Sequence, residues 1–285
     1  MLGHCPSGVR EGRIPGVGKP SFEREHAMRK HARLLMTISV VLLVLCARPA
    51  MSQTTIFTVP TADTVAKGDV YIEVAYLPQN PNSHGVDKLD VVIPRIVVGI
   101  GGNMEVGANG PIERSTFTTI PLINRPAFQA VRSDAFLEPN MKWKFVSNSS
   151  LGLAASVGGK LTMPVRENAV DDMHALFYSN ISRRVVVGAY GPRFTIGPYA
   201  VIPGRSYWEG TKAGAIVGLE QPIHPRASLV ADWFSGKNDL GAFTPGVSFA
   251  LPASSSLKVG YRFGNDSYGS NKSNRYPYVS YGFKL

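Results

Sequence analysis

The sequence has no cysteine after residue 52, because its only two cysteines are Cys5 and Cys46. This part of the chain therefore has neither disulfides nor thiolate metal sites available to it. It also lacks any apolar run of about 20 residues, the length that a transmembrane helix requires. Charged residues make up only 18% of the whole sequence, which is low for a protein whose outer surface meets water on every side. A helical membrane protein and a disulfide-stabilised fold are excluded.

Catalytic and metal-binding patterns are also missing after residue 52. The three histidines there, His84, His174 and His224, have no His or Cys partner at the spacing of metal ligands. The sequence contains no G-x-S-x-G elbow and no His-x-Ser pair. We therefore expect no catalytic residues, no metal site, no cofactor and no enzymatic activity.

The N-terminal part reads as a targeting segment. Three basic residues lie within 29–33, an apolar stretch covers 34–46, and the small residues Ala50 and Ser52 follow. This order predicts a secretory signal peptide over residues 28–52, with cleavage after Ser52. The apolar stretch is too short to span a bilayer.

Residues 1–27, which precede this signal, are rich in Gly and Pro, and we expect a non-native or disordered extension. The first 52 residues hold 8 of the 30 Lys and Arg and 3 of the 20 Asp and Glu. The remaining chain has 22 basic and 17 acidic residues, so its net charge is about +5 where the whole sequence has +10. So mild a charge does not indicate a nucleic-acid partner.

Apolar residues alternate with polar or small residues along most of the remaining sequence. Residues 151–165, LGLAASVGGKLTMPV, show the pattern most clearly. A period of two indicates a β-strand with one apolar face. The segments are long, and a membrane-spanning strand needs about 9–11 residues. We expect twelve strands, at 69–77, 88–100, 103–109, 134–146, 150–163, 174–187, 190–202, 210–221, 226–235, 241–250, 255–264 and 275–285.

The connections between these segments alternate between short and long, which is typical of a barrel with short turns at one end and longer loops at the other. The connection at 110–133 is the longest. It either folds inward as a constriction or stands outside as a surface loop. Residues 53–67, which precede the first strand, form either a periplasmic segment or a plug inside the barrel.

The chain ends in RYPYVSYGFKL, an aromatic strand that a soluble protein seldom leaves at a free edge. In a closed barrel the last strand pairs with the first, so no edge remains. With this ending and this alternation, residues 53–285 resemble the bacterial outer-membrane β-barrel proteins. Members of that group typically end in an alternating aromatic strand with a terminal Phe, where this chain has Leu285.

The resemblance implies an all-β fold, a transmembrane antiparallel up-and-down β-barrel of about 12 strands over residues 68–285. It also implies export by the signal peptide, location in the outer membrane of a Gram-negative-type bacterium, and contact with outer-membrane lipid. Tyr281, Phe283 and Leu285 would be the signal that the barrel-assembly machinery recognises. A secreted soluble β-sandwich also shows alternation. We favour the barrel because the non-apolar faces are rich in Gly, Ala and Ser rather than uniformly charged.

If the apolar side chains contact lipid, the opposite faces of the strands contain the residues that line the lumen. These residues are Arg95, Lys142, Lys144, Lys160, Lys212, Lys258, Arg262 and Glu138. They predict a narrow, mildly cationic channel or porin for small solutes, with anions favoured. In the alternative, the charges pair across a closed lumen, and the protein is a structural or binding barrel whose extracellular loops contact a partner.

The hairpin over 134–163 permits a sharper prediction, because partners across two paired strands share a face. A loop from Ser147 to Ser149 would place Lys142 opposite Ala154 and Glu138 opposite Gly158. Each long charged side chain would then face a small residue and have room to reach into the lumen.

Overall fold

The structure is a computed structural model, and it describes residues 54–79, 86–118, 129–165, 173–185, 190–204, 210–238, 240–265 and 275–285. The predicted extension and signal peptide at 1–52 lie outside these residues. In the described part of the chain, no helix is long and apolar enough to cross a membrane. The strands are β1 (Val70–Gln79), β2 (Val86–Gly101), β3 (Met104–Asn109), β4 (Ile112–Thr118), β5 (Gln129–Asn148), β6 (Leu153–Pro164), β7 (His174–Arg184), β8 (Arg193–Ile202), β9 (Ala213–His224), β10 (Ala227–Phe234), β11 (Ala242–Leu251), β12 (Ser255–Gly264) and β13 (Arg275–Lys284).

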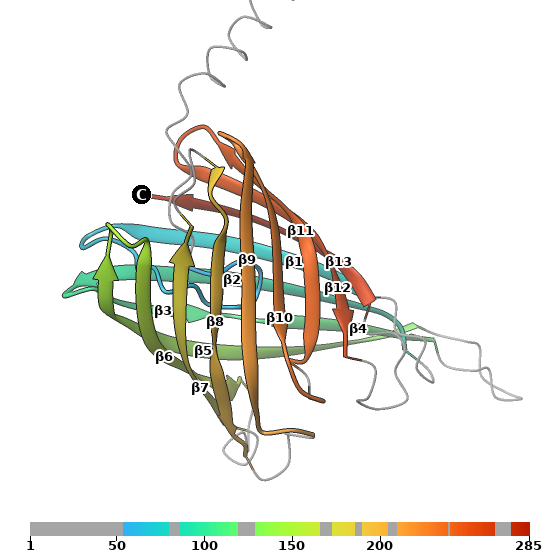
Figure 1. The fold of residues 1–285 in the computed structure, drawn as a ribbon. Coiled ribbons are helices and arrows are strands. Elements are labelled where there is room, and N and C mark those ends of the chain that lie inside the picture. Colours follow the sequence, from blue (N-terminus) through green and yellow to red (C-terminus); the bar gives the residue numbers. More distant parts are fainter. Residues whose placement is uncertain are drawn as a thin grey trace, which may run out of the picture. The chain divides into compact units, whose positions relative to one another are not determined.

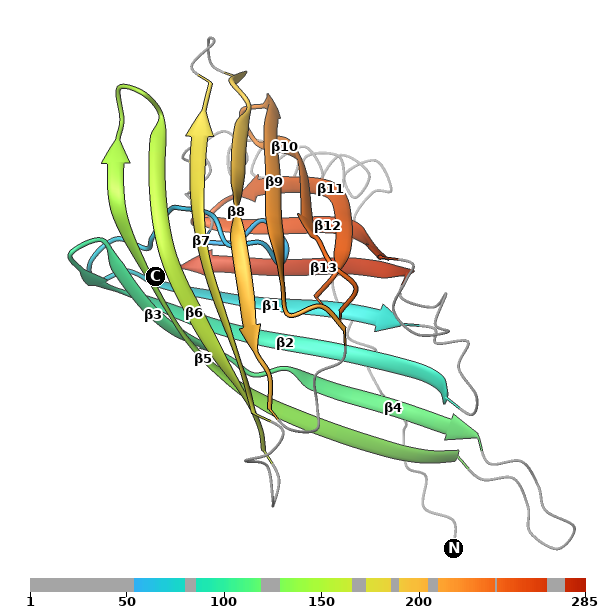
Figure 2. The same cartoon turned by 60° about the horizontal axis from the view of Figure 1, so that its bottom comes forward.

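These strands form one antiparallel sheet that closes on itself (Figures 1 and 2). The first and last strands pair in a continuous register from Tyr71 with Lys284 to Tyr76 with Val279. Leu285 N donates to Val70 O at 2.8 Å and completes the seam. The predicted pairing of the C-terminal strand with the N-terminal strand is therefore confirmed, and closure leaves neither of these strands with a free edge.

Strands β3 and β4 are two halves of one barrel strand, so the barrel has twelve strands. Both halves lie between β2 and β5 and pair with both of them. Pro111 has no N–H and interrupts the ladder between the halves. Around this break Gly110 N donates to Pro94 O, and Phe136 N donates to Pro111 O. The all-β fold and the predicted strand number are confirmed.

The interpretation of residues 110–133 as a loop is wrong. Residues 112–118 form β4, and residues 129–133 belong to the start of β5. Polar residues such as Arg114 and Arg132 weaken the alternation here, and the Gly110–Pro111 pair looks like a turn in the sequence. The remaining part of the predicted loop, 119–128, lies outside the described residues.

The hairpin register predicted for residues 134–163 is also wrong in detail. The turn covers 149–152, and Lys142 lies opposite Gly158 instead of Ala154. A register shift between Lys144 and Val146 moves the pairing further. The side-chain faces nevertheless keep their alternation, and Lys142 does face a small residue.

The outer face of the barrel is apolar. Exposed side chains on it include Val74, Ile96, Met141, Val157, Ile181, Ile196, Leu229, Val259 and Val279. Aromatic pairs lie toward the two ends of the strands, with Trp143–Phe145 and Tyr281–Phe283 at the end with the short turns and Tyr261–Phe263 at the other. An apolar band between aromatic side chains is typical of a barrel whose outer face contacts lipid.

The apolar outer face gives a prediction for Val259, which lies in the middle of β12 and is 42% exposed. Val259→Arg should lower the free energy of unfolding from lipid vesicles by about 2–4 kcal/mol, because the guanidinium would lie near the bilayer midplane. Leu151→Arg, in the β5–β6 turn, is the control and should cost about 0–1 kcal/mol. Denaturant titration in vesicles measures both values. Equal values for the two variants would contradict a lipid-facing Val259.

Candidate functional site

Residues 54–66, which we call the lumen segment, lie inside the barrel (Figure 2). Ile56, Phe57, Val59, Thr61 and Ala62 are each at most 1% exposed. Residues 53–67 were expected to form either a periplasmic segment or a plug, and residues 54–66 have the position of a plug. The amino-acid pattern could not distinguish these two positions, because the segment carries a single charged residue and no clear period.

The lumen segment passes the C-terminal end of β2 before it continues into β1. Lys67 bridges Gly99 in parallel, and Gly68 N donates to Gly99 O at 2.9 Å. A Cβ at Gly99 would overlap the backbone oxygens of Val65 and Ala66. A glycine is therefore required at this position for the segment to enter so close to the wall.

Within the barrel the lumen segment forms a small hairpin. Thr61 N donates to Thr54 O, and Ile56 N donates to Val59 O, both at 3.0 Å. The tip of the hairpin therefore presents successive backbone N–H groups in one direction. Such an arrangement of N–H groups forms a concave site for an anion.

Asp232 of β10 supplies that anion. Its Oδ2 atom accepts from Phe57 N at 3.1 Å, Thr58 N at 2.6 Å and Val59 N at 2.8 Å. The hydroxyl of Thr58 also donates to Oδ2 at 3.3 Å. Asp232 is 1% exposed, so these contacts compensate a carboxylate that is almost wholly removed from solvent.

The carbonyl groups of the segment accept hydrogen bonds from side chains on several other strands of the wall. Lys258 Nζ donates to Ile56 O at 2.8 Å and to Thr55 O at 3.2 Å. Lys142 Nζ donates to Thr54 O, Tyr278 Oη to Phe57 O, and Asn180 Nδ2 to Pro60 O. The wall thus holds the main chain of the segment between one carboxylate and a set of donors.

The Phe57 ring fits against glycines of the wall. An added Cβ at Gly246 or at Gly260 would lie 2.6 Å from Phe57 Cζ, so no larger residue fits at either position without a shift. Tyr278 meets the same ring edge to face, with the ring centroids 5.0 Å apart. Val59 packs in a separate apolar cluster of β-barrel side chains, which includes Ile216 and Phe234.

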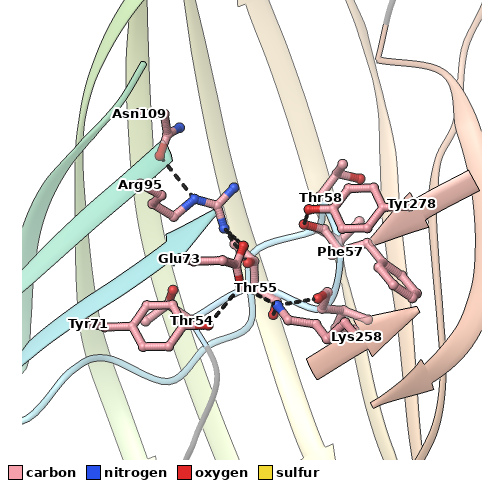
Figure 3. Close-up of polar contacts among 12 residues, drawn as sticks. Thr54, Thr55, Phe57, Thr58, Tyr71, Glu73, Arg95, Asn109, Lys258 and Tyr278 are labelled. Carbon is pink, nitrogen blue, oxygen red and sulfur yellow. Dashed lines mark hydrogen bonds and ion pairs between the residues drawn. The ribbon is translucent and has the colours of Figure 1, made fainter. Parts of the chain in front are cut away.

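Glu73 of β1 is the centre of the buried polar network shown in Figure 3. Its carboxylate pairs with Arg95 at 3.2 Å and with Lys258 at 2.8 Å. Tyr71 Oη also donates to it at 2.7 Å. Arg95 further donates to Asn109 Oδ1 and to Thr55 Oγ1, so this network joins the wall to the lumen segment.

Three other buried or partly buried cations of the wall are paired as well. Lys142 pairs with Glu105 at 2.9 Å, and Lys160 pairs with Glu138 at 2.7 Å. Arg193 of β8 binds both Glu220 and Asp63 of the lumen segment. Most of the charges described in this lumen therefore lie in pairs between neighbouring or nearby strands, and Asp63 of the lumen segment takes part in one of them.

The predicted lumen residues differ in their positions in the structure. Those that lie inside are Arg95, Lys142, Lys160, Lys258, Arg262 and Glu138, and all are buried or partly buried. Lys144 is partly buried near the short-turn end of β5. Lys212 is exposed and directly precedes β9.

At the C-terminus, Tyr281 is 47% exposed and Leu285 is 71% exposed, and Phe283 is partly buried. Tyr281 and Phe283 lie side by side on the outer face of β13. Their recognition by an assembly machinery remains a prediction.

Sequence reasoning missed the partners of the lumen segment. Asp232, Asp63 and Arg193 contact or belong to this segment, and no sequence pattern assigned a role to any of them. The contacts between residues 57–59 and Asp232 span more than 170 positions. No local pattern encodes so distant a pair.

The described residues contain no group of acidic, His or Cys side chains that could hold a metal ion. No known family model matches the sequence, and no curated protein matches it. The fold is similar to the COG4313 outer membrane channel from Pseudomonas putida, with a TM-score of 0.50, 14% identity, and coverage of 79% of this chain and 98% of that chain. The translocator domain of the autotransporter NalP from Neisseria meningitidis matches with a TM-score of 0.38, 16% identity, and coverage of 79% and 91%.

The contacts of Asp232 predict how firmly the lumen segment is held. Asp232→Asn removes the charge that accepts three N–H groups, and a hydrogen bond to a charged group contributes about 1.5–3 kcal/mol. Hydrogen exchange at the amides of residues 57–59 should become at least about ten-fold faster. Asp90→Asn, which changes a partly exposed carboxylate bonded to Tyr76 Oη and distant in sequence from the segment, should leave these rates unchanged. Unchanged rates in Asp232→Asn would show that other contacts hold the segment.

Proposed function

We propose that this protein is an outer-membrane channel whose lumen is closed from within by the lumen segment and opens when that segment moves. The observation that carries the proposal is the attachment of the main chain of residues 55–59 to Asp232 and Lys258. Ile56, Phe57 and Val59 also pack in apolar clusters of the wall, and the contacts with the two charged side chains add to this packing. A polar attachment can be exchanged for water and can therefore be reversed.

Location in the outer membrane of a Gram-negative-type bacterium is part of this proposal. The apolar outer face and the terminal aromatic side chains support it, and so does the barrel fold shared with an outer membrane channel. Outer-membrane lipid and the barrel-assembly machinery are the partners that this location requires. The proposal includes no catalytic role.

The open channel would favour small anions only weakly. Every buried Lys of the wall described above has a carboxylate partner, so the wall is close to neutral. Departure of the segment removes the carboxylate of Asp63 from Arg193. The inner wall would then have six cationic and five anionic side chains among those described: Arg95, Lys142, Lys160, Arg193, Lys258 and Arg262 against Glu73, Glu105, Glu138, Glu220 and Asp232.

A closed barrel that binds a partner through its loops is the second candidate. The buried ion pairs and the filled lumen favour it as much as they favour a gated channel. The two candidates differ in one respect, because loosening the segment gives conductance only in a channel.

Planar bilayers give the direct test, with protein 53–285. The unaltered protein should conduct rarely. Phe57→Ala removes a fully buried ring, a change that costs about 3–5 kcal/mol in a packed site. This variant and Asp232→Asn should each raise the open fraction at least about ten-fold, since each 1–2 kcal/mol changes a two-state ratio by a factor of about 5–30. Phe177→Ala, on the exposed outer face of β7, is the matched control and should behave as the unaltered protein.

A reversible lock distinguishes opening from damage. Ala62 N donates to Ser182 Oγ at 3.1 Å, which makes Ala62→Cys with Ser182→Cys a suitable disulfide pair in a chain that has no other cysteine after residue 52. In Asp232→Asn the oxidised pair should abolish conductance, and a reducing agent should restore it. A folded Asp232→Asn barrel that inserts and never conducts would overturn the channel and favour the closed binding barrel.

A further inference from the structure

We infer that the inner wall between Asp232 and Lys258 is a binding site for short peptides, and that residues 54–63 occupy it as a built-in ligand. This inference deepens the proposed function and rests on it, because the site is accessible only when the lumen segment leaves. It names the solute class of the channel as short peptides with a free amino terminus and apolar side chains.

The wall recognises features that every peptide has. Asp232 accepts three consecutive N–H groups, while Lys258 donates to two consecutive carbonyl groups on the same hairpin. Asn180 and Tyr278 donate to two further carbonyl groups. Main-chain hydrogen bonds supply affinity in peptide-binding proteins, and side-chain pockets add the selection.

The pockets define which side chains fit. The space against Gly246, Gly260 and the ring of Tyr278 holds an aromatic ring. The next pocket, lined by Leu176, Ile216 and Phe234 among others, holds the β-branched Val59. These walls are apolar, so a peptide with charged side chains at either position would lose its hydration without compensation.

Asp232 also has an acceptor that the lumen segment does not use. Its Oδ1 atom is buried and has no hydrogen-bond partner among the described residues. A carboxylate has about four acceptor positions, and the segment fills only those of Oδ2. A free α-ammonium at the position of Phe57 N would bring three donors and a positive charge to both oxygens. An external peptide that begins with an aromatic residue therefore makes a contact that the continuous chain cannot make. It lacks the two carbonyl groups before residue 57 that Lys258 binds in the segment, so it depends on Asp232, Tyr278 and Asn180.

An external peptide must compete with the lumen segment for the site. A tethered segment acts at an effective concentration of about millimolar or above, so an external peptide displaces it only if the segment is loosened or the peptide binds better. The site would thus be closed without peptide and opened by peptide.

The test uses protein 53–285 in micelles and a synthetic peptide with the sequence of residues 57–63, FTVPTAD, carrying a fluorophore at its C-terminal end. Fluorescence anisotropy measures binding to the unaltered protein, to Phe57→Ala and to Phe57→Ala with Asp232→Asn. Phe57→Ala should bind at least about ten-fold more tightly than the unaltered protein, because its own segment competes less. Addition of Asp232→Asn should remove at least about ten-fold of this affinity, and so should acetylation of the peptide amino terminus.

A second variant allows the same test if the Phe57→Ala barrel does not fold. A Cβ at Gly218 would overlap Ile56 Cδ1 of the segment, while its nearest wall contact, Thr195 Cβ, lies at 3.3 Å. Gly218→Ala therefore disturbs the segment mainly through Ile56, while Thr195 of the wall would have to move by only a few tenths of an ångström. It should also bind the peptide more tightly than the unaltered protein.

The outcomes separate this inference from the proposed function. Loosened variants that conduct but do not bind the peptide, or that bind it equally with and without Asp232, overturn the inference and leave the channel. Variants that bind the peptide through Asp232 without conducting support the site and overturn the channel. A peptide with the residue order scrambled should not bind, and equal binding of the scrambled peptide would also overturn the inference.

Discussion

Buried charge is the constraint on which the interior of this barrel depends. A charged group removed from water must be paired and hydrogen-bonded, or its desolvation is not compensated. The wall satisfies this requirement with pairs that join neighbouring or nearby strands, such as Glu73 with Arg95 and Lys258. Asp232 differs, because its Oδ2 atom accepts from N–H groups of the lumen segment while its Oδ1 atom has no hydrogen-bond partner among the described residues. This carboxylate is one of the groups that determine the position of the segment.

The barrel itself could be predicted from the alternation of apolar with polar or small residues, because each strand has an apolar outer face and a more polar inner face. Residues 255–264 were predicted with the observed bounds, and most other strands differ by a few residues. The failure lay at 110–133, where Gly110 and Pro111 divide one barrel strand into β3 and β4. A sheet can accommodate a proline when neighbouring groups take over its hydrogen bonds. Whether they do so becomes clear only when the pairing of the strands is known.

The inner residues were predictable one by one, but their arrangement was not. Alternation alone indicated that Lys142, Lys160 and Lys258 point inward. It could not show that each meets a carboxylate, because register decides which residues approach across the strands and the predicted register of the 134–163 hairpin was in error. The lumen segment has no periodic pattern, so its place could emerge only from contacts with residues far along the chain.

The free-energy cost of opening is concentrated at one residue in this arrangement. When the lumen segment leaves, Lys258 keeps Glu73, Lys142 keeps Glu105 and Arg193 keeps Glu220, so the wall remains neutralised. Among the charged residues named here, Asp232 is the one that would lose all of its described hydrogen bonds at once. Water or a ligand must replace them, because a buried carboxylate without donors is strongly destabilising. A lumen that admits water can meet this need, and a lumen that admits an ammonium group meets it better. In the proposed channel, the same carboxylate would therefore keep the lumen closed and determine which solute lowers the cost of opening it.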